Sequence, residues 1–188
     1  DMQNDISESV TTMDLRNGSI IVSVENGQQY AEQKNIKQQI SDLVVTTNND
    51  ETTNTLTIEG GTTAAKVTLH NVNIDASGAA VSVSGDVELI ISGTNTLQSG
   101  WGHAGVEKAD DNGTLTISGS GTLEAYGGYW GAGIGSGSEK GCSNIVIESG
   151  TITAKGGALG AGIGGGQHAA GQNLSLIHIS EPTRLDVI

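Results

Sequence analysis

Two short sequence units alternate along this chain, and their repetition constrains the fold more than any other feature. The first unit occurs as LIISGTNTL (89–97), LTISGSGTL (115–123) and IVIESGTIT (145–153), at spacings of 26 and 30 residues. The second occurs as HAGV (103–106), GAGIGSG (131–137) and GAGIGGG (160–166), at spacings of 28 and 29 residues. Self-similarity at a period of a few tens of residues is typical of solenoids and other repeat architectures.

Apolar and polar residues alternate within the first unit, as in Leu115 and Ile117 or Ile145 and Ile147. This alternation predicts half-buried strands, and the glycines between strands mark the turns. One such unit cannot bury its own apolar edge, but coils stacked about 4.8 Å apart would pair every strand with its neighbours. The sequence therefore predicts an all-β parallel β-helix of about four to five coils.

The chain divides into three predicted regions: an irregular N-terminal cap with the first strands (1–50), the β-helix coils (51–173) and a non-native tail (174–188). A cap covers the exposed terminal edge of a solenoid. Within it, Gln28–Ile40 is rich in Gln, contains neither Gly nor Pro, and is a candidate helix.

The tail is set apart because Leu174–Arg184 reads LSLIHISEPTR, which resembles an in-frame translation of an adapter used in sequencing libraries. This removes His178 and Arg184 from the candidate site residues. The alternative is a terminal strand, since Leu176 and Ile177 are good strand formers.

Charge and hydropathy exclude two classes of partner. With 8 basic and 21 acidic residues, the net charge of −13 would repel phosphate backbones, so we expect no nucleic-acid partner. No apolar run approaches the roughly 18 residues of a membrane-spanning helix, so we expect no membrane insertion. Phe is absent and aromatic residues make up 3% of the chain, which predicts an interior of aliphatic side chains.

The repeats resemble a known family. The segments SGTNTL, GTLTISGSGTLEA and ESGTITAKGG, together with the doubled GAGIG, are similar to glycine-rich repeats of bacterial cell-surface proteins that carry carbohydrate-binding domains of the right-handed parallel β-helix type. The resemblance covers about Thr55–Gly166. It implies a right-handed coil and an extracellular or surface-attached module that binds polysaccharide, sometimes with calcium.

Aromatic residues provide the main candidate site. Four of the five lie within thirty residues of one another: Trp101, Tyr126, Tyr129 and Trp130. Aligning the equivalent residues Ala104 and Ala132 puts Trp101 in register with Tyr129. Adjacent coils would then stack the two rings on one lateral surface.

Such a surface suits sugars, because a flat ring presents apolar contact to the C–H face of a pyranose. His103 and Gln98 would supply polar groups at its rim. The alternative is that the rings only cover backbone. A purely structural solenoid stalk would bury Trp101 and Tyr129, whereas a binding module would expose them side by side.

Acidic residues form a second candidate site. Asp110, Asp111 and Asn112, followed by Gly113 and with Glu107 nearby, offer the hard oxygen ligands that calcium accepts. The alternative is a solvated turn before the next strand, because Asp, Asn and Gly are common turn residues. Calcium is thus a possible ligand, although the expected carbohydrate binding requires no cofactor.

Catalysis would require paired carboxylates, or calcium with a basic residue, close to a bound polysaccharide. The basic residues that precede the tail show no spacing relative to the acidic residues that would indicate a catalytic site. We therefore expect a non-catalytic carbohydrate-binding or adhesion module. A structural stalk and a calcium-dependent polysaccharide lyase or hydrolase are the alternatives.

Overall fold

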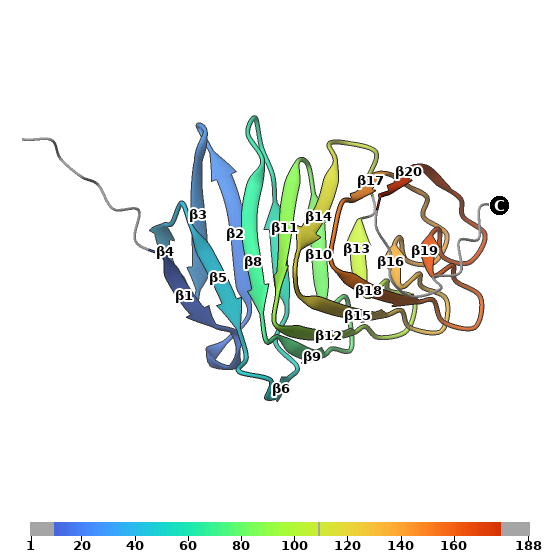
Figure 1. Ribbon diagram of the computed structural model, residues 1–188, viewed down its shortest axis with the longest axis horizontal. Coiled ribbons are helices and arrows are strands. Elements are labelled where there is room, and N and C mark those ends of the chain that lie inside the picture. Colours follow the sequence, from blue (N-terminus) through green and yellow to red (C-terminus); the bar gives the residue numbers. More distant parts are fainter. Residues whose placement is uncertain (1–9, 109, 178–188) are drawn as a thin grey trace, which may run out of the picture.

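The computed structural model describes residues 10–108 and 110–177. Strands in these residues form three sheets that run the length of the molecule (Figure 1). Sheet A contains β1 (Thr11–Asp14), β5 (Leu43–Thr46), β8 (Ala65–His70), β11 (Val87–Ser92), β14 (Leu115–Gly119), β17 (Cys142–Ile147) and β20 (Gly171–Leu176). Sheet B contains β2 (Ile20–Glu25), β7 (Leu56–Glu59), β10 (Val81–Ser84), β13 (Val106–Lys108), β16 (Ile134–Gly135) and β19 (Ile163–Gly164). Sheet C contains β6 (Glu51–Thr52), β9 (Asn73–Asp75), β12 (Thr94–Gln98), β15 (Thr122–Tyr126) and β18 (Thr151–Lys155).

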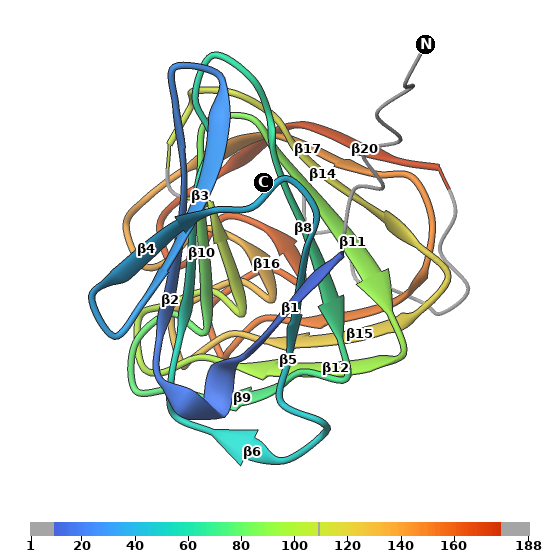
Figure 2. The same cartoon turned by 90° about the vertical axis from the view of Figure 1, so that its left-hand side faces the viewer.

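The chain visits the sheets in the order A, C, B and then returns to A one coil further along (Figure 2). Strands of successive coils pair in parallel, as in Leu89 opposite Ile117 and Ile117 opposite Ile147. The predicted right-handed parallel β-helix is confirmed. It has about six turns, so the prediction of four to five coils was too low. The early coils were missed because they lack the GAG unit.

The core consists of aliphatic columns that run along the coil axis. One column in sheet A contains Val67, Leu89, Ile117 and Ile147, all fully buried. The period-two alternation produces this column, because every second residue of a strand points to the same face. Each such side chain contributes about 1.5–3 kcal/mol relative to an exposed position, and the described interior contains no aromatic ring.

Sheet B is extended at the N-terminal end by a hairpin, β3 (Gln28–Gln33) and β4 (Ile36–Gln39), which pairs antiparallel with β2. The helix expected over Gln28–Ile40 was therefore wrong. Asn26 and Gly27 have φ values of 51° and 76°, and an Asn-Gly pair with positive φ at both residues favours a tight hairpin turn. This turn signal outweighs the helical composition of the Gln-rich segment.

A side chain of the hairpin continues the pairing of β8 beyond the start of β5 in sheet A. β5 pairs with β8 from Leu43 opposite Val67 onward, so Lys66 lies just before the first paired residue. The Gln29 side chain takes this place: its Oε1 accepts from Lys66 N at 2.7 Å, and its Nε2 donates to Lys66 O at 3.0 Å. The primary amide of Gln29 thus acts as a substitute peptide group at the edge.

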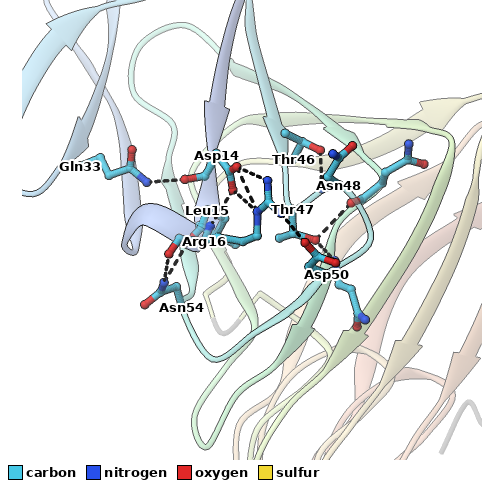
Figure 3. A network of polar contacts seen from close by, with 11 residues as sticks. Asp14, Leu15, Arg16, Gln33, Thr46, Thr47, Asn48, Asp50 and Asn54 are labelled. Atoms are coloured by element: carbon cyan, nitrogen blue, oxygen red, sulfur yellow. Dashed lines mark hydrogen bonds and ion pairs between the residues drawn. The ribbon is translucent and has the colours of Figure 1, made fainter.

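A polar network fixes the first coil, in which a 3₁₀ helix, η1 (Leu15–Asn17), occupies the place of a sheet C strand (Figure 3). Asp14 caps η1 by accepting from Arg16 N at 2.9 Å, and it also pairs with the Arg16 guanidinium. The Arg16 guanidinium pairs with Asp50, which lies between β5 and β6 of the second coil, and Gln33 Nε2 donates to Asp14 O at 2.8 Å. The network joins the cap hairpin to the first two coils.

The hydrogen bond from the Arg16 side chain holds the pKa of Asp14 below its usual range, although burial opposes this effect. Ionised Asp14 therefore stabilises the folded protein at pH values above the ordinary carboxyl pKa. This stabilisation is lost as the pH falls through the lowered pKa of Asp14 in the folded protein. We expect Arg16→Ala to reduce the free energy of unfolding at pH 7, and we expect its difference from the wild type to shrink as the pH falls below the ordinary carboxyl pKa. Urea unfolding of both proteins at each pH measures this difference, and a pH-independent difference would contradict the assignment.

The start of the segment assigned to the tail continues the fold. Leu174, Ser175 and Leu176 belong to β20 and pair with Ile145, Val146 and Ile147 of β17. This matches the alternative of a terminal strand as far as Leu176. His178, Arg184 and the rest of the segment lie outside the described residues, and the non-native origin of 174–188 stays a prediction, as do the three region boundaries.

Candidate functional site

Three bends of equal length connect sheet C to sheet B in successive coils. They span residues 99–105, 127–133 and 156–162, seven residues each. The bends stack on one another through backbone hydrogen bonds: Gly128 N donates to His103 O at 2.9 Å and Leu159 N donates to Tyr129 O at 3.2 Å. The strands on both sides of the bends are in register from coil to coil, so equivalent residues of the three bends lie above one another along the coil axis.

A column of glycines brings these bends into close contact. A Cβ atom added to Gly128 would lie 1.9 Å from the carbonyl oxygen of Gly100, and one added to Gly157 would lie 1.9 Å from that of Gly128. Real Cβ atoms do not approach backbone this closely, so only glycine fits at these positions. The residue after the glycine is Trp101 in one coil and Tyr129 in the next.

The Trp101 and Tyr129 rings lie side by side on the outside of the coil. Their centroids are 5.9 Å apart with an interplanar angle of 60°. Trp101 is 66% exposed and Tyr129 is 54% exposed. The predicted register is confirmed, since Val106 lies opposite Ile134 in the strands that follow the two bends. The observed exposure is that expected of a binding surface and differs from the burial expected of a plain stalk.

Trp130 supports both rings from a half-buried position. Its centroid lies 5.1 Å from that of Trp101 and 6.1 Å from that of Tyr129, edge-on in both cases. Edge-to-face ring pairs contribute about 0.5–1.5 kcal/mol beyond the burial of their surface. Trp130 therefore holds the exposed rings in a defined arrangement. We call Trp101, Tyr129 and Trp130 the ring cluster.

His103 lies on the same bend as Trp101, two residues further along. Its Nδ1 is 3.1 Å from Glu107 Oε2, and the His103 side chain is 41% exposed whereas that of Glu107 is 12% exposed. Glu107 Oε2 also accepts from Ala104 N at 2.9 Å. The carboxylate thus orients the imidazole and ties it to the bend, and the imidazole stays accessible.

Tyr126 lies apart from the ring cluster. It belongs to β15, where it is in register with Gln98 of the preceding coil and Lys155 of the next. Its hydroxyl donates to Glu124 Oε2 at 3.2 Å, and burial, reinforced by Glu124, raises the pKa of the phenol. The ring contacts among the described residues do not include Tyr126, so it belongs to the outer face of sheet C beside the bend.

The acidic turn contains a cation that sequence reasoning missed. Lys108 is fully buried, and its Nζ donates to Asp110 O at 2.8 Å, to Asp110 Oδ1 at 3.0 Å and to Asn112 O at 3.3 Å. Lys108 lies opposite Val83 at an inward position of β13. Lys108 follows Val106 by two residues, so the period-two alternation of a strand could have indicated that Lys108 points inward.

The other member of the predicted calcium cluster is engaged in the next coil. Asp111 Oδ1 accepts from Ser143 Oγ at 3.0 Å. No group of three or more His, Cys, Asp or Glu side chains in residues 10–108 and 110–177 is arranged to hold a metal ion. The ammonium group of Lys108 donates hydrogen bonds to oxygen atoms of this turn that a calcium ion would need as ligands. Calcium binding by Asp110, Asp111 and Asn112 stays a prediction.

Comparison with known proteins agrees with the architecture. A family model described as a beta helix repeat matches residues 115–138 and 145–167. No curated protein and no solved structure gives a significant match. The described residues contain no helix long and apolar enough to span a membrane. The architecture and the repeat match together define the class: this chain is a parallel β-helix protein.

The glycine column generates a stability prediction. We expect Gly128→Ala to lower the free energy of unfolding by about 1–3 kcal/mol or more, because the methyl group would overlap the Gly100 carbonyl. Gly78→Ala is the matched control, since an added Cβ there meets nothing within 4 Å. Urea unfolding of the two variants measures the difference. Equal stability of the two would show that the coils do not approach closely at this bend.

The Lys108 ion pair generates a second prediction. Asp110→Ala leaves the Lys108 ammonium buried without its carboxylate, and we expect a loss of about 1–3 kcal/mol. Lys108→Met removes the charge and keeps an apolar side chain beside Val83, so its cost should be smaller. Urea unfolding again provides the measurement. A larger loss for Lys108→Met would mean that the buried charge itself stabilises the coil.

Proposed function

We propose that this chain is a non-catalytic carbohydrate-binding module that holds polysaccharide on the ring cluster. The observation that carries the proposal is the exposure of Trp101 and Tyr129 side by side on adjacent coils. Single exposed apolar residues are ordinary on protein surfaces, but a contiguous group is typical of a binding site.

The chemistry of the surface suits sugars. Indole and phenol faces pack against the C–H faces of pyranose rings, and the polar edges of Trp and Tyr tolerate water at the rim. His103 lies on the same bend and can bond a sugar hydroxyl, while Glu107 keeps its imidazole in place. Gln98, in the strand leading to Trp101, is a second polar group close to this surface. Because Trp130 pre-orders the rings, little conformational entropy is lost on binding.

The location and partners follow from the same proposal. The resemblance of the repeats to bacterial surface proteins supports an extracellular or cell-surface location and a role in adhesion. The net charge of −13 disfavours nucleic acid as a partner. Calcium is an optional ligand in this proposal, at the turn of Asp110, Asp111 and Asn112.

A structural solenoid is the second candidate, and the unbroken aliphatic columns of sheet A favour it. A lyase or hydrolase is a weaker candidate. Glu107 is bonded to Ala104 and His103, and Asp110 is bonded to Lys108, so these two carboxylates have structural roles. Release of reducing or unsaturated ends from polysaccharides would overturn the non-catalytic assignment.

A glycan array with and without calcium tests the function. We expect Trp101→Ala and Tyr129→Ala each to weaken binding about tenfold or more, as for central aromatic residues of other interfaces. Ile36→Ala is the matched control, because Ile36 is an exposed apolar residue on β4, in the cap hairpin. Binding that survives both ring variants would reject the ring cluster as the site. No glycan binding by the unaltered chain would favour the structural solenoid.

A further inference from the structure

The ring cluster occupies a position that recurs in every coil with a seven-residue bend. Gln98, Tyr126 and Lys155 are in register as the last residues of β12, β15 and β18. Three residues further along each bend stand Trp101, Tyr129 and Ala158. These three positions form one column parallel to the coil axis, and the glycines before them keep the column in register.

The spacing of this column suits a linear glycan. Adjacent strands of a sheet are about 4.8 Å apart, and the Trp101 and Tyr129 centroids are 5.9 Å apart. One sugar ring in an extended chain has a similar length. Successive sugars of a chain lying along the axis would therefore meet successive rings, whereas a chain lying across the axis would meet one ring and then leave the column.

Polar groups repeat along the same direction. Gln98 precedes Trp101 by three residues, and Tyr126 precedes Tyr129 by three residues. Each of these two coils thus carries one ring on the bend and one hydrogen-bonding side chain at the end of the preceding strand of sheet C. The chain as a whole carries a net charge of −13, and this field would repel a chain of uronic acids, whereas Lys155, in register with Tyr126 in the next coil, is one exposed cation beside the column.

We infer that the ring cluster binds an extended, uncharged glycan whose chain runs parallel to the coil axis, with one sugar for each coil. This inference rests on the proposed function and adds the direction and charge class of the ligand. Trp101 and Tyr129 then form two adjacent sugar subsites. Ala158, which is exposed, marks the same position in the next coil, where no ring is present.

A ring added on the column should create a third subsite. Ala158→Trp places a ring in line with Tyr129, and Thr153→Trp places one on the same coil but displaced across the axis, on the outer face of β18. We expect Ala158→Trp to tighten binding of β-1,4-linked glucose oligosaccharides about two- to tenfold. The gain in affinity should appear for the trisaccharide and longer chains and not for the disaccharide. Thr153→Trp should give no gain.

Isothermal titration of the wild type and both variants, with oligosaccharides of increasing length, provides the measurement, and urea unfolding checks that the variants fold. A gain for Thr153→Trp alone, or for neither variant, overturns the axial direction and leaves the proposed function intact. Tighter binding of galacturonate oligomers than of glucose oligomers of equal length overturns the uncharged class. If the wild type binds no glycan, the proposed function and this inference both fail.

Discussion

Parallel pairing between successive coils is the interaction on which the rest of the structure depends. It makes neighbours of residues that are 22 to 36 positions apart in sequence, as in Val67, Leu89, Ile117 and Ile147. The aliphatic core, the glycine bends and the ring cluster are all columns produced by this one register. A shift of a single residue would turn every inward side chain outward, so the alternation of apolar and polar residues also fixes the register.

The bend between sheets C and B shows how backbone packing places a pair of exposed rings. The Gly100–Gly128–Gly157 column lets three backbones approach more closely than any side chain would allow. The following residue is then directed outward at the same place in each coil. Trp101 and Tyr129 are exposed for this reason, and Trp130 limits their motion from below. The exposed ring cluster is thus a consequence of the solenoid and needs no separate loop.

Much of the fold could be predicted from the sequence, because aligning the repeats with one another shows which residues lie in adjacent coils. The strand alternation and the GAG units predicted the parallel β-helix and the pairing of Trp101 with Tyr129. The cap hairpin was missed because the composition of Gln28–Ile40 suits a helix, whereas its structure follows from the turn at Asn26 and Gly27. Tyr126 was grouped with the other rings by proximity in sequence, but its place in β15 directs it onto the sheet. The Lys108 ion pair was missed because an inward lysine breaks the pattern that defines the core.

The identity of the ligand could not be predicted in the same way. Ring exposure depends on register, which the repeats specify, but in the proposed function the choice of sugar would depend on individual hydrogen bonds from residues such as His103 and Gln98. These contacts depend on side-chain placement relative to a ligand, and no repeat pattern encodes that placement.

A crystal structure of the chain with a bound β-1,4-linked glucose oligosaccharide would show coil register and ligand direction together. We expect consecutive sugars over Trp101 and Tyr129, with the glycan parallel to the coil axis. An oligosaccharide bound elsewhere, or coils in which Trp101 and Tyr129 do not lie in adjacent turns, would contradict this expectation.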